Sequence, residues 1–133
     1  MIKAQNIKTT IKYYGGFLFV LENIININKV LYDYFKEDIV NIFLDGYCLD
    51  YYFLLKEFYP ESILVMEKNK EHCASLINGN VYDVSGIRST SNFIIPSKIE
   101  EDFIHDFYNR MDNYDYERII KLLKGKVKVK VNI

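Results

Sequence analysis

The chain has 133 residues, half of them apolar, two cysteines and a formal net charge of −1. This length and composition predict one folded domain spanning residues 1–133, and they exclude a disordered chain. The near-neutral charge disfavours nonspecific nucleic-acid binding, and two cysteines do not indicate a disulfide framework, so we expect a reducing, cytoplasmic environment.

The first 44 residues give the weakest structural signal. The glycine pair at positions 15 and 16 predicts a turn, and the apolar run 17–21 fits either a strand or a helix. Because this run is short and ends at Glu22 and Asn23, we expect neither a signal peptide nor a membrane span. Apolar spacing over residues 28–43 predicts a helix.

Cys48 begins the next predicted helix, in the segment DGYCLDYYFLLKEFYP. We expect Asp45 to be the N-cap and the helix to end at Tyr59, because Pro60 restricts the residue before it. Backbone N–H groups and the helix dipole of a first turn favour a thiolate, and the same N–H groups can stabilise an oxyanion. Alternatively, Cys48 is a small buried apolar residue, as most free cysteines are.

The next segment predicts three antiparallel strands. A strand over residues 62–67 should pair with the strand that begins at His72, and Asn78-Gly79 predicts a two-residue hairpin turn after it. That turn pairs Ile77 with Asn80, so His72 and Asp83 come out as diagonal neighbours on one sheet face. Alternatively, His72 is an ordinary surface residue and Asp83 only ends a strand.

The same register places the second cysteine, Cys73, on the face opposite His72. We therefore expect Cys73 to be a packing residue and not a nucleophile. Cys48, His72 and Asp83 supply the three residue types that a thiol nucleophile needs, and they appear in the chain order nucleophile, base and orienting group. No Cys and His spacing typical of zinc occurs, and we expect neither a metal nor a cofactor.

These residues carry a family resemblance. Gly46 and Cys48 in DGYC, His72 in EHCASLI, and Asp83 in NGNVYDVSG resemble the papain-like superfamily in its transglutaminase-like form, especially small bacterial and phage members. The resemblance covers about residues 45–88. It implies that Cys48 is the nucleophile, His72 the general base and Asp83 the residue that orients the histidine.

The C-terminal third predicts structure but no chemistry. Ser97 and Glu100 form a capping box before a helix with an apolar stripe that includes Phe103 and Phe107. A second helix is predicted over residues 114–124, ending at Gly125. The alternating tail KVKVKVNI, residues 126–133, predicts a half-buried edge strand.

The predicted fold is therefore α+β, with an antiparallel sheet packed against a central helix that carries Cys48. The first functional hypothesis is a cysteine-nucleophile enzyme acting on an amide or acyl group of a protein or peptide: a peptidase, deamidase or transferase, with hydrolysis as the default. The second is a non-catalytic binding or inhibitor protein of phage type that targets a host protein. Neither hypothesis involves nucleic acid or a membrane.

Overall fold

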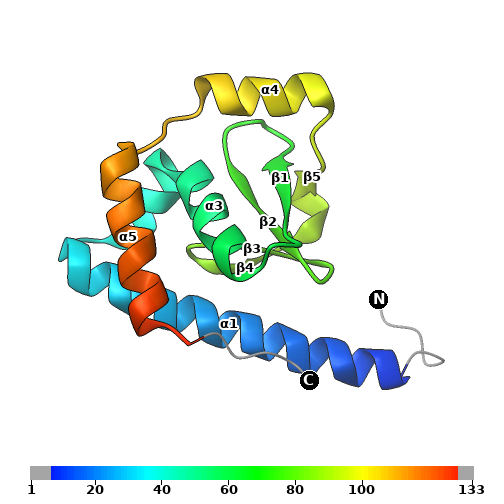
Figure 1. Cartoon of the computed structure of the whole chain (residues 1–133). Coiled ribbons are helices and arrows are strands. Elements are labelled where there is room, and N and C mark those ends of the chain that lie inside the picture. Colours follow the sequence, from blue (N-terminus) through cyan, green and yellow to red (C-terminus); the bar gives the residue numbers. More distant parts are fainter. Residues whose placement is uncertain (1–6, 129–133) are drawn as a thin grey trace.

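A computed structural model describes residues 7–128 of the chain, with side chains described for residues 19–44 and 46–128 (Figure 1). The elements follow the order α1 (Ile7–Phe35), α2 (Ile39–Asn41), η2 (Ile42–Gly46), α3 (Cys48–Phe58), β1 (Ile63–Glu67), β2 (Cys73–Ile77), β3 (Asn80–Asp83), β4 (Gly86–Arg88), η3 (Thr90–Asn92), β5 (Phe93–Ile94), α4 (Lys98–Phe107) and α5 (Asn113–Lys126). The expected α+β class is confirmed.

The five strands form one curled antiparallel sheet in the order β4-β3-β2-β1-β5. The β2–β3 hairpin has the predicted register, because Ile77 pairs with Asn80 and Leu76 with Val81. Both turn residues have positive φ, 50° at Asn78 and 83° at Gly79, as a two-residue turn of this kind requires. The hairpin thus fixes which residues of β2 and β3 share a face.

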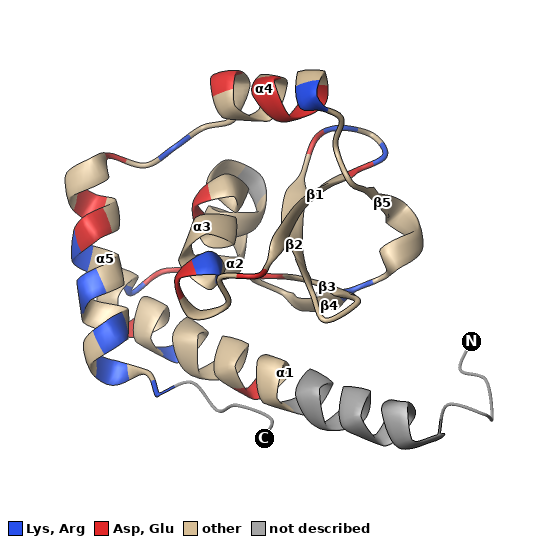
Figure 2. Cartoon of the chain, turned by 45° about the vertical axis from the view of Figure 1, so that its right-hand side comes forward, with Lys and Arg blue, Asp and Glu red and all other residues tan. Residues whose placement is uncertain are grey.

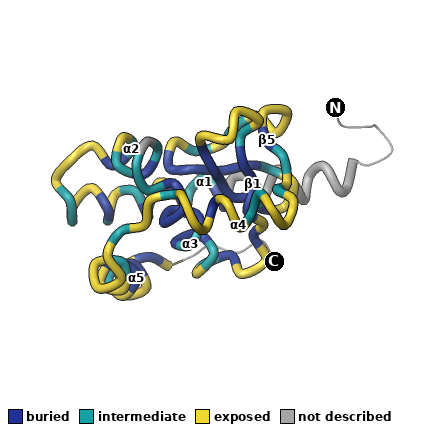
Figure 3. Tube along the Cα trace, turned by 90° about the horizontal axis from the view of Figure 1, so that it is seen from above, coloured by how far each residue is buried: buried dark blue, intermediate teal, exposed yellow. Residues whose placement is uncertain are grey.

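The two faces of the sheet hold separate apolar clusters. On one face, α3 packs against Leu64, Met66 and Cys73, and the large cluster beside it joins α1, α3 and α5 to Ile77 and Tyr82. The other face, inside the curl of the sheet, holds a smaller cluster of Val65, Ala74, Val81 and Phe93. Figure 3 shows that burial is concentrated in the strands and α3, with α4 and α5 largely exposed.

The N-terminal third differs from the sequence-based expectation. The predicted turn at Gly15-Gly16 is wrong, since α1 continues through both residues to Phe35. The cost of a glycine within a helix, about 1 kcal/mol each, is small against the propensity of the whole segment. The predicted helix over residues 28–43 is interrupted at Lys36, which has a φ of 57°, and resumes after Asp38, whose side chain accepts from the N–H of Val40.

The C-terminal third is partly as expected. The capping box of Ser97 and Glu100 is confirmed at the start of α4. The second helix is longer than predicted, because α5 continues through Gly125 to Lys126. The edge strand was predicted over residues 126–133, but Lys126 is the last residue of α5 and is not in a strand. Residues 129–133 lie outside the described part of the chain.

The apolar stripe of α4 is not part of the core. Ile104 is fully buried, but the outer face of the helix shows Ile99, Phe103 and Phe107 with exposed fractions of 83%, 45% and 71%. The same helix carries most of its charge as carboxylates (Figure 2). Among residues 7–128, no helix has both the length and the apolar character needed to cross a membrane.

Candidate active site

Cys48 is the first residue of α3 and lies on the side of the helix that faces the sheet. Its side chain is 8% exposed and packs in a cluster with Leu49, Met66 and Ile104. The expected N-cap at Asp45 is wrong, because Asp45 lies within η2 and Tyr47 occupies the cap position. Tyr47 leaves helical geometry, with φ −125° and ψ 42°, so the chain changes direction there and α3 starts anew at Cys48.

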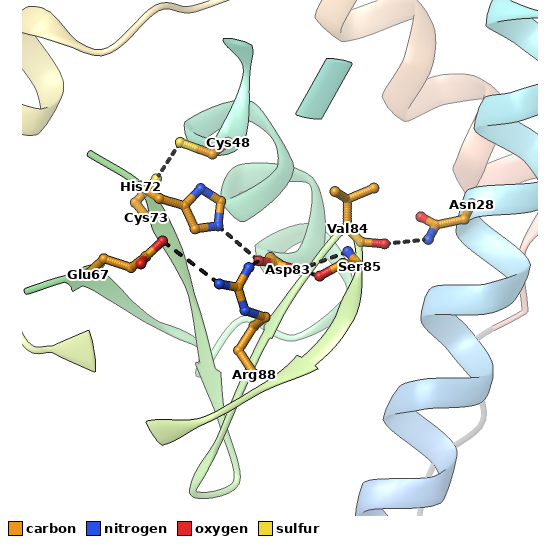
Figure 4. A network of polar contacts seen from close by, with 9 residues as sticks. All are labelled: Asn28, Cys48, Glu67, His72, Cys73, Asp83, Val84, Ser85 and Arg88. Carbon is orange, nitrogen blue, oxygen red and sulfur yellow. Dashed lines mark hydrogen bonds and ion pairs between the residues drawn. The ribbon is translucent and has the colours of Figure 1, made fainter. Parts of the chain in front are cut away.

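His72 and Asp83 form a buried pair. His72 precedes β2 by one residue, Asp83 ends β3, and the Nε2 atom of His72 lies 2.8 Å from Oδ2 of Asp83. The exposed fractions are 6% for His72 and 3% for Asp83, so neither is a surface residue. The other ring nitrogen of His72, Nδ1, lies on the side of the ring toward Cys48 (Figure 4). The structure therefore brings Cys48, His72 and Asp83 to one end of β2.

Asp83 is held by more groups than the imidazole. Its Oδ1 atom accepts hydrogen bonds from the backbone N–H of Ser85, at 2.8 Å, and from the Ser85 hydroxyl. Its Oδ2 atom also accepts from Nη1 of Arg88 at 2.7 Å. Burial opposes ionisation of Asp83, but the bonds from His72 and Ser85 and the charge of Arg88 outweigh it and lower its pKa. The carboxylate therefore stays charged and keeps the imidazole oriented.

Cys73 packs in a buried apolar cluster, as expected, but it also makes a contact that was not expected. It does lie on the face opposite Asp83, but α3 packs on that same face, and the two sulfur atoms of Cys73 and Cys48 are 3.3 Å apart. The expectation that Cys73 serves only in packing overlooked this contact. A signal was available in the sequence, because a buried Cys48 on the helix and a packing Cys73 on the strand can meet where the helix covers the sheet.

The thiol of Cys48 is poised to ionise. The hydrogen bond from Cys73 is the largest influence on its pKa; burial opposes it, and His72 adds a further favourable contribution, with a net lowering to about 5. For His72, burial acts to lower the pKa, but the hydrogen bond to Asp83 and the neighbouring Cys48 raise it to about 9. The Nδ1 atom of His72 is buried and has no other hydrogen-bond partner, which leaves it to interact with the sulfur of Cys48. Both pKa shifts favour a thiolate on Cys48 and an imidazolium on His72 near neutral pH.

Asp50 lies two residues after Cys48 on α3, and a negative charge so near would oppose a thiolate on Cys48. It is fully buried, and its carboxylate accepts hydrogen bonds from Nε of Arg110 at 2.8 Å and from the backbone N–H of Met111 at 3.0 Å. Arg110 therefore compensates the charge of Asp50, and the carboxylate faces the segment between α4 and α5. This pairing reduces the repulsion between Asp50 and a thiolate on Cys48.

Two further residues support the site from outside it. Arg88 extends from Asp83 to Glu67, where Nη2 lies 3.9 Å from Oε1, and its guanidinium lies over the ring of Phe93. Asn28 of α1 donates to the backbone carbonyl of Val84, next to Asp83, at 2.8 Å (Figure 4). The sequence did not predict either contact, because each joins two segments that are distant in the chain and whose packing no local sequence pattern indicates.

Among the residues that the structure describes, no three His, Cys, Asp or Glu side chains gather in a way that suits a metal ion. The polar groups at the site are instead hydrogen-bonded to one another: His72 and Arg88 both bond Asp83, and the thiol of Cys73 donates to the sulfur of Cys48. The arrangement fits nucleophilic chemistry by a thiolate beside a proton donor.

Comparison with known proteins identifies a family. A family model described as Phage YunG-like protein matches residues 24–124, about three quarters of the chain. Searches of curated proteins and of solved structures found no match. The family match contradicts the resemblance to the papain-like and transglutaminase-like superfamily, because the matching model is not from that superfamily. The short motifs behind the resemblance cover too little of the chain to define a family, so the roles of Cys48, His72 and Asp83 depend on their geometry alone.

Proposed function

We propose that this chain, which belongs to the Phage YunG-like protein family, is a small cysteine-nucleophile enzyme that acts on an amide or acyl group of a protein or peptide. The observation that carries this proposal is the buried His72, bonded through Nε2 to Asp83 and presenting Nδ1 toward Cys48. A buried histidine with a carboxylate on one side and an ionisable thiol on the other has the arrangement of a general acid and base.

The chemistry follows from the ionic state of the pair. The thiolate of Cys48 attacks a carbonyl carbon, a carbon–sulfur bond forms, and the carbonyl electron pair moves to the oxygen. The N–H groups in the first turn of α3 lack partners within the helix and support that oxyanion. His72 then gives the Nδ1 proton to the leaving nitrogen, and the carbon–nitrogen bond breaks.

The second half of the reaction frees the enzyme. Water is the default acceptor: Nδ1 of His72 takes its proton while the oxygen attacks the thioester, and the sulfur of Cys48 leaves as a thiolate. Asp83 stays ionised throughout and stabilises each imidazolium state. An amine in place of water would give transfer, and a glutamine side chain as substrate would give deamidation; the first half-reaction is common to all of them.

The proposal includes a reducing compartment, such as the cytoplasm. Both cysteines are free thiols, and the function of Cys48 requires that it remain reduced. The nearby second thiol makes this requirement more stringent, because two sulfurs in contact are readily joined under oxidising conditions.

An activated acyl ester tests the proposal. The reduced protein is incubated with p-nitrophenyl acetate, and the acyl adduct is located by mass spectrometry of the intact chain and its peptides. We expect an acetyl group on Cys48, no adduct in Cys48→Ala, and slow acylation in His72→Ala. His105→Ala, which changes an exposed histidine of α4, is the matched control and should acylate normally. Acylation that is equally fast in His72→Ala and wild type contradicts the proposal.

The alternative, a non-catalytic protein that binds a host protein, has one observation in its favour. The outer face of α4 shows Ile99, Phe103 and Phe107 to solvent, and exposed apolar patches often mark interaction sites. If Cys48 resists acylation and alkylation in the folded protein, the α4 face becomes the functional surface to investigate. Substitution of Phe103 and Phe107 would then be the first step.

A further inference from the structure

The contact between Cys48 and Cys73 has a use that acyl chemistry does not require. The two sulfur atoms are 3.3 Å apart, and both residues are free thiols. A disulfide has a sulfur–sulfur distance of about 2 Å, so a shift of roughly 1 Å would join them. Cys48 is the first residue of α3 and Cys73 is the first residue of β2, so the two sulfur atoms meet where the starts of these elements lie side by side.

We propose that Cys48 and Cys73 are an oxidative modification site, at which a small hydroperoxide oxidises Cys48 and Cys73 then closes a Cys48–Cys73 disulfide. The proposal depends on the contact between the two thiols and on a reactive Cys48, and it goes beyond the acyl chemistry proposed above. The geometry supports a division of roles, because Cys48 has 8% of its surface exposed and Cys73 has none. Only Cys48 is open to an oxidant from solution.

The first step consumes one hydroperoxide. The sulfur electron pair of the Cys48 thiolate attacks the nearer oxygen of hydrogen peroxide, the oxygen–oxygen bond breaks, and hydroxide leaves and is protonated to water. Cys48 becomes a sulfenic acid, two electrons more oxidised than the thiol. The lowered pKa of Cys48 supports this step, since the thiolate is the nucleophile.

The second step consumes the sulfenic acid. The sulfur of Cys73 attacks the sulfur of Cys48, the sulfur–oxygen bond breaks, and the hydroxyl group leaves as water with the Cys73 proton. Before oxidation, the hydrogen bond to the Cys48 thiolate, together with burial, raises the pKa of Cys73 and keeps it protonated. Oxidation removes that negative charge, so the largest influence holding the proton on Cys73 disappears when its sulfur must attack.

The consequence is a reversible inactive state. In the disulfide, the sulfur of Cys48 is no longer a thiolate and does not attack a carbonyl carbon, so Cys48 is neither alkylated nor acylated. A small dithiol such as dithiothreitol restores both thiols by thiol–disulfide exchange. Without Cys73, further peroxide would take the sulfenic acid of Cys48 to the sulfinic acid, which thiols do not reduce. Cys73 thereby protects the nucleophile as well as switching it off.

The test uses the full chain, reduced and then treated with hydrogen peroxide in modest molar excess near neutral pH. Remaining thiols are blocked with N-ethylmaleimide, and the intact mass and the non-reduced peptides are measured. We expect the wild type to lose two hydrogen atoms, to yield a linked peptide pair containing Cys48 and Cys73, and to recover fully in dithiothreitol. In Cys48→Ser, Cys73 should stay reduced under the same treatment.

Cys73→Ser provides the complementary result. We expect its Cys48 to gain two or three oxygen atoms and to resist dithiothreitol, with the fold checked by thermal unfolding. The wild type alone also decides the question, in case this variant does not fold. A wild type that accumulates sulfinic acid on Cys48 while Cys73 stays free, or that forms disulfides only between chains, overturns the proposal. The test measures only the oxidation state of the two cysteines by mass. Its result therefore does not depend on whether Cys48 is acylated in the test of the proposed function.

Discussion

Arg88 donates from Nη1 to Oδ2 of Asp83 at 2.7 Å, the same oxygen that receives Nε2 of His72 at 2.8 Å. One carboxylate oxygen therefore serves two cationic groups, and the charge of Arg88 is permanent whereas that of His72 depends on pH. Arg88 keeps Asp83 ionised when the imidazole is neutral. Its positive charge also weakens the effect of the Asp83 carboxylate on the imidazole, which lowers the pKa of His72 relative to a site without Arg88.

Replacing Arg88 tests this competition. In Arg88→Met, a positive charge near His72 is removed and the full charge of Asp83 acts on the imidazole, so the pKa of His72 should rise above its wild-type value. Titration of the His72 ring by NMR gives the measurement. Arg118→Met, in which an exposed arginine of α5 is replaced, should leave the titration unchanged. An unchanged or lower pKa in Arg88→Met would show that Arg88 serves only to join the strands.

Alkylation of Cys48 by iodoacetamide should follow the low pKa of its thiol. In wild type the rate should rise with a midpoint near pH 5, well below the value of about 8.5 for a free thiol. Because the hydrogen bond from Cys73 is the largest influence, Cys73→Ala should raise this midpoint more than His72→Ala does. A midpoint near 8.5 in wild type, or the reverse order of the two variants, contradicts this account of the thiolate.

The His72–Asp83 pair should make stability depend on pH. The pKa of His72 is raised from 6.5 to about 9 in the folded protein, so its contribution is complete below about 6.5 and is lost as the pH rises through 9. In Asp83→Asn that contribution is reduced by up to a few kcal/mol. The difference in unfolding free energy between wild type and variant should therefore shrink between pH 6 and pH 10. Urea denaturation at several pH values measures it, and a constant difference refutes this linkage.

Asn28 should stabilise the site from α1. Its side chain donates to the carbonyl of Val84 and accepts from the hydroxyl of Tyr51 at 2.7 Å. Asn28→Ala leaves both partners unsatisfied, so we expect a loss of about 1–3 kcal/mol in unfolding free energy. Asn41→Ala, at an exposed position of α2, is the matched control and should cost less. Equal losses for the two variants would argue against a role for Asn28 in holding the turn after Asp83.

Ile104 should control access to Cys48. It is the buried residue of α4 and packs in the same cluster as the cysteine. Ile104→Ala should speed labelling of Cys48 by a bulky maleimide by several-fold, whereas Ile99→Ala, on the exposed face of the same helix, should not. Labelling is compared below the unfolding transition of each variant. Equal rates in the two variants would show that α4 does not cover the thiol.

The sequence allowed the hairpin, and with it part of the site, to be predicted in detail. Asn78 and Gly79 both accept positive φ, which few other residue pairs do, so the turn and the register followed from two letters. Register then placed His72 and Asp83 on one face. The first 44 residues lacked such a constraint, because a glycine pair weakens a helix by an amount that a long segment can absorb.

Other parts of the site could not be predicted because they join distant segments. The contacts of Arg88 with Glu67, of Asn28 with Val84, and of Asp50 with Arg110 depend on how α1, the sheet and α5 pack together. No local pattern encodes these distances. The family was misjudged for a related reason: a few catalytic residue types in a suitable order can occur without common ancestry.

The pairing of Asp50 with Arg110 and Met111 also bears on the mechanics of α4. That helix is tied near its C-terminal end by the hydroxyl of Tyr108, which donates to the carbonyl of Lys70, and just beyond it by the buried carboxylate of Asp50. Between Ile95 and Tyr108, Ile104 alone is buried. Because both ties lie at the C-terminal end of α4 and Ile104 is its one buried side chain, we expect α4 to open locally while the sheet and α5 remain folded. Its amide protons should exchange with solvent by this local opening, long before those of β2, which requires the whole domain to unfold.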